Sequence, residues 1–262
     1  MFSYDFMIRA FVAGIIIAIL AAISGSFIVL RRYSMITETL AHSALVGVAV
    51  GVIAGSNPLW MAVVAALLSA WIIEYLRSYF HLYSDSVLAI MLSGSLALAV
   101  IIVSLAGAFN SSLFSYLFGS ILSVTENDLV VMSLFGVIAL SLLGVFYKQL
   151  YFIAYDEEVA RTSGIKVDML NFLLVSIVAI IIALSIRIVG TLLIGAMMVI
   201  PTVAALRFRQ GFAKTILIAL LFSVVAVIVG MSSSYFFSLP SGATIVLTLL
   251  FIFIFSLIVN RR

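Results

Sequence analysis

The stretch RRYSMITETLAHSALVGVAVG, residues 31–51, decides how the rest of the chain is interpreted. Two arginines open it, and an almost wholly apolar run follows. Within that run Glu38 and His42 are four residues apart. On a helix this spacing places two side chains on one face, about 5–6 Å apart at Cβ. Two ionisable groups on one face of an apolar helix need a physical reason to be there.

The composition indicates an integral membrane protein. The 262-residue chain is 66% hydrophobic and only 9% charged, with a mean hydropathy of +1.39, whereas soluble domains carry about 25% charged residues. It has no cysteine, which excludes disulfides and thiolate metal sites. A net charge of +3 fits arginines in cytoplasmic loops, and we expect no nucleic-acid partner. The N-terminal MFSYDFMIRAF is expected to be retained, because no signal-peptide cleavage site follows it.

The apolar runs predict an all-α polytopic bundle of about eight or nine transmembrane helices. A span needs about 20 mainly apolar residues. The candidate spans are residues 9–30, 36–55, 59–76, 86–106, 129–147, 169–186, 188–206, 213–236 and 243–259. Residues 111–124 are too short and serine-rich for an easy span and predict a surface or re-entrant helix, so the count is eight to ten. No soluble domain fits between the spans, and residues 1–262 are expected to form one transmembrane domain.

The basic residues predict the orientation. With nine spans and the N-terminus outside, the C-terminus is cytoplasmic, and all 13 basic residues except Arg9 and Arg187 lie on the cytoplasmic side. The opposite orientation would place those two residues inside and all the other basic residues outside, against the positive-inside rule. The longest polar interval, residues 148–168, is then cytoplasmic.

The depth of Glu38 and His42 favours a functional site. At about 1.5 Å per residue from Arg32, Glu38 lies about 9 Å and His42 about 15 Å into the membrane, close to the middle of a core about 30 Å thick. Ionisable groups at that depth usually face a bundle interior or a watery path, and a carboxylate with a neutral imidazole suits zinc or manganese-like cations. The alternative is a pair that only hydrogen-bonds to itself. Because we expect no other buried acid in any span, we favour a metal site.

Small residues and a proline predict close packing and a kink. Gly47 and Gly51 are four residues apart on the helix of Glu38, a spacing that lets another helix approach closely. The span RIVGTLLIGAMMVIPTVAALR, residues 187–207, contains Gly190, Gly195 and Pro201. Proline kinks a helix, and interrupted spans often line substrate paths.

The polar interval contains a second motif, YDEEVARTSGIKV, residues 155–167. It predicts a short amphipathic helix capped by Asp156, with Glu157 and Glu158 in its first turn and Gly164 at its end. It is interpreted either as an ordinary capped surface turn or as a docking element for a cytoplasmic motor.

Together these segments resemble ABC-importer permeases for zinc, manganese and iron, the ABC-3 type. The resemblance lies in GSFIVLRRYSMITETLAHSALVGVAVG and, in the same order, in residues 84–98, 115–129, 155–170, 187–205 and 239–247. Glu38 replaces the family's usual aspartate, and Val46 replaces a proline before Gly47. The aspartate that often precedes the last proline motif is also missing, since Phe237, Ser238 and Leu239 precede Pro240.

The resemblance implies a type II ABC-importer permease that works as a homodimer with two ABC ATPase subunits and an extracytoplasmic metal-binding protein. It implies a prokaryotic inner or plasma membrane, a transported divalent metal (zinc, manganese or iron) and no permanently bound cofactor. Glu158, Ala160 and Gly164 match the family's E-x-A-x-x-x-G docking pattern, with Asp156 ahead of them. ATP would bind only the partner, and this chain has no G-x-x-x-x-G-K-[ST] phosphate loop and no catalytic residue of its own.

Two other classes of protein compete with a permease as interpretations of the sequence. A gradient-driven secondary metal transporter or channel could use Glu38 as a cation site, but it has no use for a docking element. An intramembrane enzyme using His42 is disfavoured because neither G-x-S-x-G nor H-E-x-x-H occurs.

Overall fold

The protein is described by a computed structural model that covers residues 5–80, 82–105, 111–120 and 124–259. Over these residues every regular element is a helix. The elements are α1 (Asp5–Leu30), α2 (Met35–Ile53), α3 (Pro58–Tyr79), α4 (Ser84–Leu105), α5 (Ser111–Phe118), α6 (Glu126–Val145), α7 (Tyr147–Tyr155), α8 (Glu157–Thr162), α9 (Val167–Val189), α10 (Ile194–Leu206), α11 (Phe212–Phe237) and α12 (Ser241–Val259). His81, Arg261 and Arg262 lie outside the described residues.

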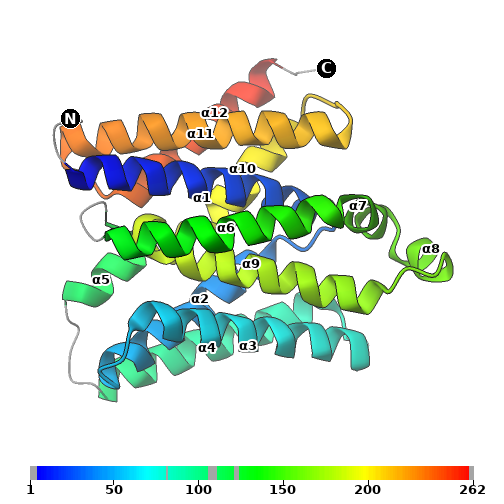
Figure 1. The fold of residues 1–262 in the computed structure, drawn as a ribbon, viewed down its shortest axis with the longest axis horizontal. Helices are drawn as coiled ribbons and strands as arrows, with labels where there is room; N and C mark the ends of the chain where they lie inside the picture. Colours follow the sequence, from blue (N-terminus) through cyan, green and yellow to red (C-terminus); the bar gives the residue numbers. More distant parts are fainter. Residues whose placement is uncertain (1–4, 81, 106–110, 121–123, 260–262) are drawn as a thin grey trace.

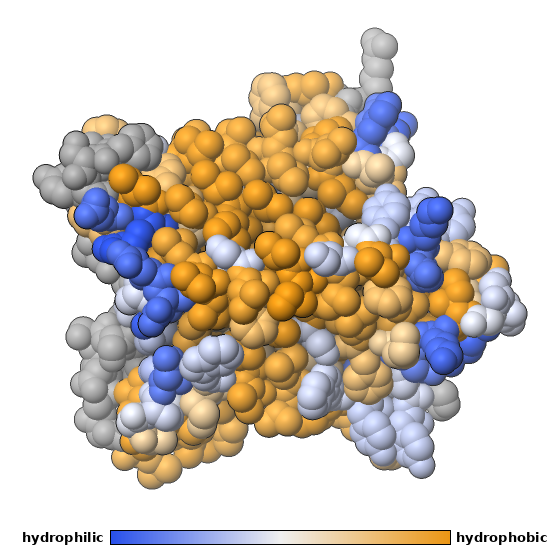
Figure 2. All heavy atoms as spheres, in the orientation of Figure 1, coloured by the Kyte–Doolittle hydropathy of each residue, from blue (hydrophilic) through white to orange (hydrophobic). Residues whose placement is uncertain are grey.

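Eight of these helices are long and apolar enough to cross a membrane: α1, α2, α3, α4, α6, α9, α11 and α12. Most of them run along the long axis of the molecule, whereas α2 and α12 run obliquely to the others (Figure 1). Hydrophobic residues cover the middle of the visible face, and hydrophilic residues gather at its two ends (Figure 2). The predicted all-α polytopic bundle is confirmed. We call the two ends the α8 end and the α5 end, after the short helices that lie there.

The core of the bundle consists of α1, α2 and α9, whose spans are the most buried. The helix α2 packs against α3 and α4, and α9 packs against α3 and α2. A Cβ at Gly47 would lie 2.2 Å from the Met61 carbonyl oxygen, and one at Gly51 would lie 2.7 Å from Pro58 Cα. Only glycine at these two positions allows α2 and α3 to come so close.

The expected full span at residues 188–206 is wrong. The helix α9 continues to Val189, where Gly190 adopts a φ of +88° and ends it. The next helix, α10, has 13 residues, a length of about 20 Å against a hydrocarbon core of about 30 Å. Pro201 lies inside α10 without ending it.

The break between α9 and α10 is held by the backbone of α5. The N–H groups of Thr191 and Leu192 donate to the carbonyl oxygens of Tyr116 and Leu117 at 2.9 and 3.3 Å. A Cβ at Gly190 would lie 2.3 Å from the Leu117 oxygen. Irregular backbone at membrane depth is tolerated when other parts of the protein satisfy it. This distant pairing is the physical reason for the short helix α10.

The turn from α1 into α2 is closed by Arg32, whose φ is +56°. The N–H of Tyr33 donates to the Ile28 carbonyl, and the N–H of Arg32 to the Val29 carbonyl, both at 3.0 Å. This is a Schellman helix end, with arginine in the position that glycine usually takes. It places Glu38 in the first turn of α2, near the α8 end.

Candidate functional site

The structure joins Glu38 and His42 on one face of α2. The Nε2 atom of His42 lies 3.3 Å from Oε1 of Glu38. The His42 side chain is 8% exposed and the Glu38 side chain 35% exposed. The second ring nitrogen of His42, Nδ1, is buried and has no hydrogen-bond partner within the described part of the chain. The pair therefore leaves one buried nitrogen unsatisfied and a carboxylate partly open.

The short helix α10 lies against this pair at Gly195. A Cβ built on Gly195 would lie 2.8 Å from Oε2 of Glu38 and 3.1 Å from Oγ1 of Thr37. The Thr37 hydroxyl donates to the Ser34 carbonyl at 2.8 Å, which fixes its oxygen. Of the residues expected in the interrupted span, Gly195 thus meets the pair, whereas Gly190 lies in the break beside α5.

A single chain does not complete a metal centre. No group of three or more histidine, aspartate and glutamate side chains lies close enough to hold a metal among the described residues. Glu38 and His42 offer two ligands, and zinc usually takes four. A carboxylate on a membrane-spanning helix that is 35% exposed needs water or another protein chain beside it. The pair therefore has an open side on which further ligands can approach.

The expectation of no other buried acid in a span is wrong. Glu74 of α3 and Asp128 of α6 are both buried. Glu74 binds Arg77 with an Oε1–Nη2 distance of 2.6 Å, and Asp128 pairs with Arg187 of α9. Each buried carboxylate has an arginine that offsets its desolvation. The three-residue spacing of Glu74 and Arg77 could have revealed the first ion pair from the sequence. The second pair has no such local signal, because Asp128 and Arg187 are 59 residues apart.

The predicted short amphipathic helix at residues 155–167 is confirmed as α8. The Asp156 carboxylate accepts the N–H of Val159 at 3.0 Å and caps the helix. At the other end, the N–H of Ile165 donates to the Ala160 carbonyl at 3.2 Å, and that of Gly164 to the Arg161 carbonyl at 3.2 Å. Gly164 has a φ of +82°, so these contacts form a Schellman end.

The two sides of α8 differ in exposure. Ala160 is fully buried against the bundle, whereas Glu158 is exposed. The helix therefore presents Glu158 outward while its other side is fixed to the protein.

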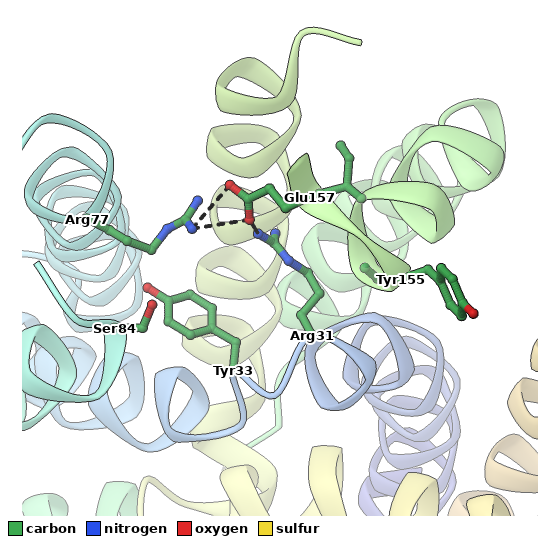
Figure 3. Close-up of a pocket in the computed structure, with 8 residues that line it drawn as sticks. Arg31, Tyr33, Arg77, Ser84, Tyr155 and Glu157 are labelled. Atoms are coloured by element: carbon green, nitrogen blue, oxygen red, sulfur yellow. Dashed lines mark hydrogen bonds and ion pairs between the residues drawn. The ribbon is translucent and has the colours of Figure 1, made fainter. Parts of the chain in front are cut away.

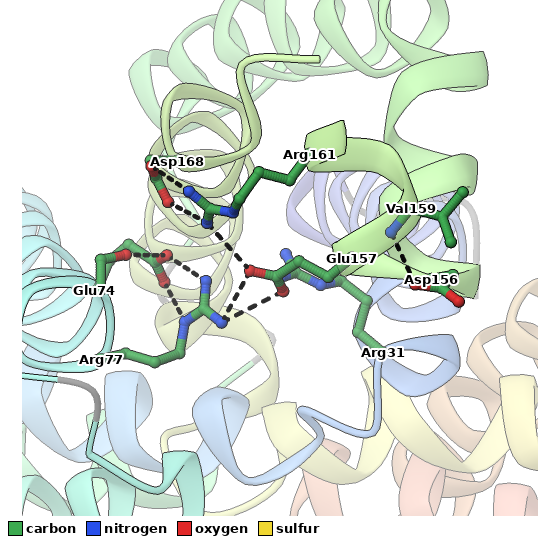
Figure 4. Close-up of polar contacts among 9 residues, drawn as sticks. Arg31, Glu74, Arg77, Asp156, Glu157, Val159, Arg161 and Asp168 are labelled. Atoms are coloured by element: carbon green, nitrogen blue, oxygen red, sulfur yellow. Dashed lines mark hydrogen bonds and ion pairs between the residues drawn. The ribbon is translucent and has the colours of Figure 1, made fainter. Parts of the chain in front are cut away.

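Sequence reasoning missed the role of Glu157, which it placed only in the first turn of the helix. Its carboxylate accepts hydrogen bonds from Arg31 at 3.1 Å and from Arg77 at 3.3 and 3.4 Å (Figure 4). Arg161 lies 3.8 Å from the same carboxylate and binds Asp168 of α9 at 2.8 and 3.0 Å. Glu157 therefore ties α8 to the ends of α1 and α3.

A polar cavity of about 250 Å³ opens beside this ion-pair cluster (Figure 3). Its polar lining residues are Arg31, Tyr33, Arg77, Ser84, Tyr155 and Glu157. It includes neither Glu38 nor His42 and so does not extend the candidate metal site.

Burial determines the electrostatics of this cavity. Burial lowers the pKa of Arg31, and the positive charge of Arg77 acts in the same direction. Burial also raises the pKa of Tyr33, with a further contribution from the negative charge of Glu74. On the exposed side of α8, the hydrogen bond to Asp168 raises the pKa of Arg161. The raised pKa values keep Tyr33 neutral and Arg161 cationic near pH 7, whereas the lowered pKa of Arg31 disfavours its cation.

An interrupted helix beside a partly buried carboxylate–imidazole pair, within a bundle of spanning helices, is typical of membrane transport proteins. The chain belongs to the ABC 3 transport family, whose model matches residues 3–260. The resemblance seen in the sequence motifs is thereby confirmed.

Relatives and a solved structure agree with this family over almost the whole chain. The chain is 31% identical to the manganese import system permease protein ScaB of Streptococcus gordonii, over 99% of this chain and 93% of the relative. It is 31% identical to the high-affinity zinc uptake system membrane protein ZnuB of Haemophilus influenzae, over 99% of both chains. It superposes with a TM-score of 0.86 on a chain of PsaBC from Streptococcus pneumoniae in complex with Fab, at 31% identity, over 97% of this chain and 91% of that chain.

Proposed function

We propose that this chain is the transmembrane permease subunit of an ATP-driven ABC importer that brings a divalent metal ion into a prokaryotic cell. The observation that carries the proposal is the family match from residue 3 to residue 260. Relatives named as manganese and zinc systems support manganese or zinc as the cargo, and iron remains a third candidate from the resemblance.

Glu38 and His42 are proposed as transient ligands of the metal on its path. One carboxylate and one imidazole hold a divalent cation less tightly than a full set of four ligands, which suits a site that must release its cargo. The buried, unpartnered Nδ1 of His42 and the open side of Glu38 support this role. The missing ligands come from water or from a second copy of this chain in a homodimer.

The α8 end is proposed to face the cytoplasm, with the N-terminus outside. Several basic residues belong to or directly flank the helix ends found here: Arg31 and Arg32 after α1, Arg77 in the last turn of α3, Arg161 in α8 and Lys166 before α9. A surplus of basic residues marks the cytoplasmic side. An extracytoplasmic metal-binding protein would then deliver the metal at the α5 end, and lipid would surround the apolar middle of the bundle.

The helix α8 is proposed to dock two ATPase subunits, one on each copy of the chain. Glu158 faces outward for this contact, Ala160 anchors the helix, and Asp156 and Gly164 fix its two ends. ATP would be bound and hydrolysed only by the partner. A gradient-driven transporter or channel has no use for such a helix, and we do not propose one.

The deciding experiment measures uptake of manganese, zinc and iron into lipid vesicles that contain this chain with its ATPase and its metal-binding protein. Glu38→Gln and His42→Ala are each expected to lower uptake by at least about 10-fold, with unchanged expression and dimer formation. Ser232→Ala is a matched control, because the hydrogen bond that the Ser232 hydroxyl makes among the described residues stays within its own helix, at the Ile228 carbonyl.

Two results would contradict the proposal. If His42→Ala transports every metal as well as the parent, the pair is only a structural hydrogen bond. If uptake proceeds without ATP and follows an imposed ion gradient, the protein is a secondary transporter.

A further inference from the structure

We propose that Gly195 is a specificity-determining partner of Glu38. By lacking a side chain, Gly195 leaves the space that the longer carboxylate of Glu38 occupies, and the two residues together set the metal preference of the site. This inference rests on the proposed role of Glu38 as a metal ligand.

The contact distances identify the carboxylate as the group that needs this space. A Cβ at Gly195 would lie 2.8 Å from Oε2 of Glu38, closer than ordinary Cβ contacts allow. It would also lie 3.1 Å from Oγ1 of Thr37 and 3.6 Å from the backbone N of Glu38. The Thr37 oxygen is held by its hydrogen bond to Ser34. A methyl group at position 195 would therefore be accommodated chiefly by displacing the Glu38 carboxylate.

Gly195 differs in this respect from the packing glycines of the bundle. At Gly25, Gly47 and Gly190 the first atom that a Cβ would meet is a backbone oxygen, at 2.1, 2.2 and 2.3 Å. Side chains there would push helices or loops apart. At Gly195 the first atom is the free end of a flexible side chain. A methyl group at Gly195 leaves the helices in place and moves a proposed metal ligand.

The position of this carboxylate matters for the choice of metal. Its other oxygen, Oε1, lies 3.3 Å from Nε2 of His42, so displacing Oε2 also alters the geometry of the pair. Metal–ligand distances in protein sites lie within about 0.2 Å of their usual values, so the position of a ligand atom is narrowly defined. Zinc favours four tetrahedral ligands, whereas manganese favours more oxygen ligands. A displaced Glu38 carboxylate therefore changes both the rate of uptake and the ratio between metals.

A shorter acidic side chain at position 38 would relieve the clash with a methyl group at position 195. Aspartate is one methylene shorter than glutamate, so its carboxylate stays nearer α2 and clear of a methyl group at position 195. Glutamate with glycine and aspartate with alanine are two compatible combinations. Glutamate with alanine is the incompatible one.

A double-mutant cycle tests this pairing in vesicles that contain the chain with its ATPase and metal-binding protein. Uptake of Mn²⁺, Zn²⁺ and Fe²⁺, each offered alone, is measured for the parent, Glu38→Asp, Gly195→Ala and the double variant. Gly195→Ala alone is expected to lower uptake about 10–100-fold and to change the Mn²⁺ to Zn²⁺ ratio. In the Glu38→Asp background it is expected to change uptake by less than about 2-fold.

Gly94→Ala is the matched control, because a Cβ at Gly94 of α4 meets nothing within 4 Å. It is expected to transport like the parent. The amount of each variant in the membrane and its thermal unfolding are measured beside uptake. If Gly195→Ala fails to accumulate, accumulation of the double variant supports the pairing, and failure of both variants overturns it.

Two further outcomes overturn the inference. One is that Gly195→Ala takes up each metal at the parental rate and with the parental ratio between metals. The other is an equal loss in the Glu38 and Glu38→Asp backgrounds, which would make Gly195 a packing residue only. Failure of the proposed function is seen separately, because Glu38→Gln would then retain uptake whatever Gly195→Ala does.

Discussion

The carboxylate of Glu157 on α8 lies 3.1 Å from the guanidinium of Arg31 at the end of α1, although the two residues are 126 positions apart in the chain. Arg31 directly precedes Arg32, whose left-handed backbone turns α1 into α2. The proposed docking helix is thus tied to the turn that leads into the helix of Glu38 and His42. We expect movement of α8 to be transmitted to the start of α2 through this carboxylate.

Replacing Glu157 is expected to separate ATP hydrolysis from transport. Glu157→Gln keeps the size of the side chain but leaves Arg31, which is 7% exposed, without its anionic partner. Coupling free energies between sites are typically 1–3 kcal/mol, so the metal transported per ATP should fall by about 5-fold or more. The check is simultaneous measurement of uptake and phosphate release in reconstituted vesicles.

The control for this variant is Glu126→Gln at the α5 end. Glu126 is 82% exposed and pairs with Arg9, and such exposed pairs contribute at most about 1 kcal/mol. Its metal-to-ATP ratio should equal that of the parent. An unchanged ratio in Glu157→Gln would show that the contact with Arg31 only fixes α8 in place.

Changes at Gly164 are expected to disrupt the end of α8 without disturbing the spans. Gly164→Pro forces φ toward −65° from its present +82° and removes the N–H that donates to Arg161. Gly164→Ala meets no atom within 4 Å, so its cost of about 1 kcal/mol is conformational only. Uptake should be lost in the proline variant and partly retained in the alanine variant.

Gly211→Ala serves as the control for Gly164, because Gly211 has an ordinary φ of −59° and open space around it. Co-purification of the ATPase with each variant reports whether docking is lost. Parental uptake by Gly164→Pro would show that α8 is only a connector.

The alkaline stability of the protein should depend on Tyr33. Burial raises the pKa of Tyr33 above its ordinary value of about 10, so the folded protein holds this proton more tightly than the unfolded chain. The contribution is fully present below pH 10 and is lost as pH rises through the higher folded pKa. Tyr33→Phe should therefore lose less stability between pH 9 and 11 than the parent, a range that spans the ordinary tyrosine pKa of about 10.

The measurement is thermal unfolding of the detergent-solubilised protein across that pH range. Tyr83→Phe is a suitable control, because Tyr83 is highly exposed. Identical pH profiles for the parent and Tyr33→Phe would contradict the expectation.

The complex is expected to contain two copies of this chain and two ATPase subunits. One chain offers a single α8 and two metal ligands, and ABC ATPases work as pairs. The check is the mass of the detergent-purified complex. One permease chain per ATPase pair would contradict the homodimer and require another source for the missing ligands.

The sequence allowed the spans to be predicted because each is a continuous apolar run of sufficient length. The run at residues 213–236, for example, becomes α11 with nearly the same bounds. The break before α10 could not be predicted in the same way. Its cause is the pairing of Thr191 and Leu192 with α5, and an apolar run looks the same whether or not a distant segment interrupts it.

The same distinction applies to the residues of the candidate site. The contact of Glu38 with His42 follows from helical spacing alone, and so does the cap of α8 by Asp156. The position of Gly195 against Glu38, and the two arginines around Glu157, depend on how distant helices pack. Glycine in an apolar span indicates packing or a kink, and only the neighbouring atoms show which side chain it accommodates.

The spacing of the ion pairs along the chain has a consequence for biogenesis. Glu74 is synthesised three residues before Arg77 and can enter the bilayer already neutralised. Arg187, the partner of Asp128, is synthesised 59 residues later, and Glu157 is synthesised 126 residues after its partner Arg31. A buried charge without its partner is unfavourable, so we expect the early helices to associate loosely until α8 and α9 have been made. A ribosome stalled before α8 would thus leave a nascent chain with its amino-terminal helices exposed to quality-control proteases.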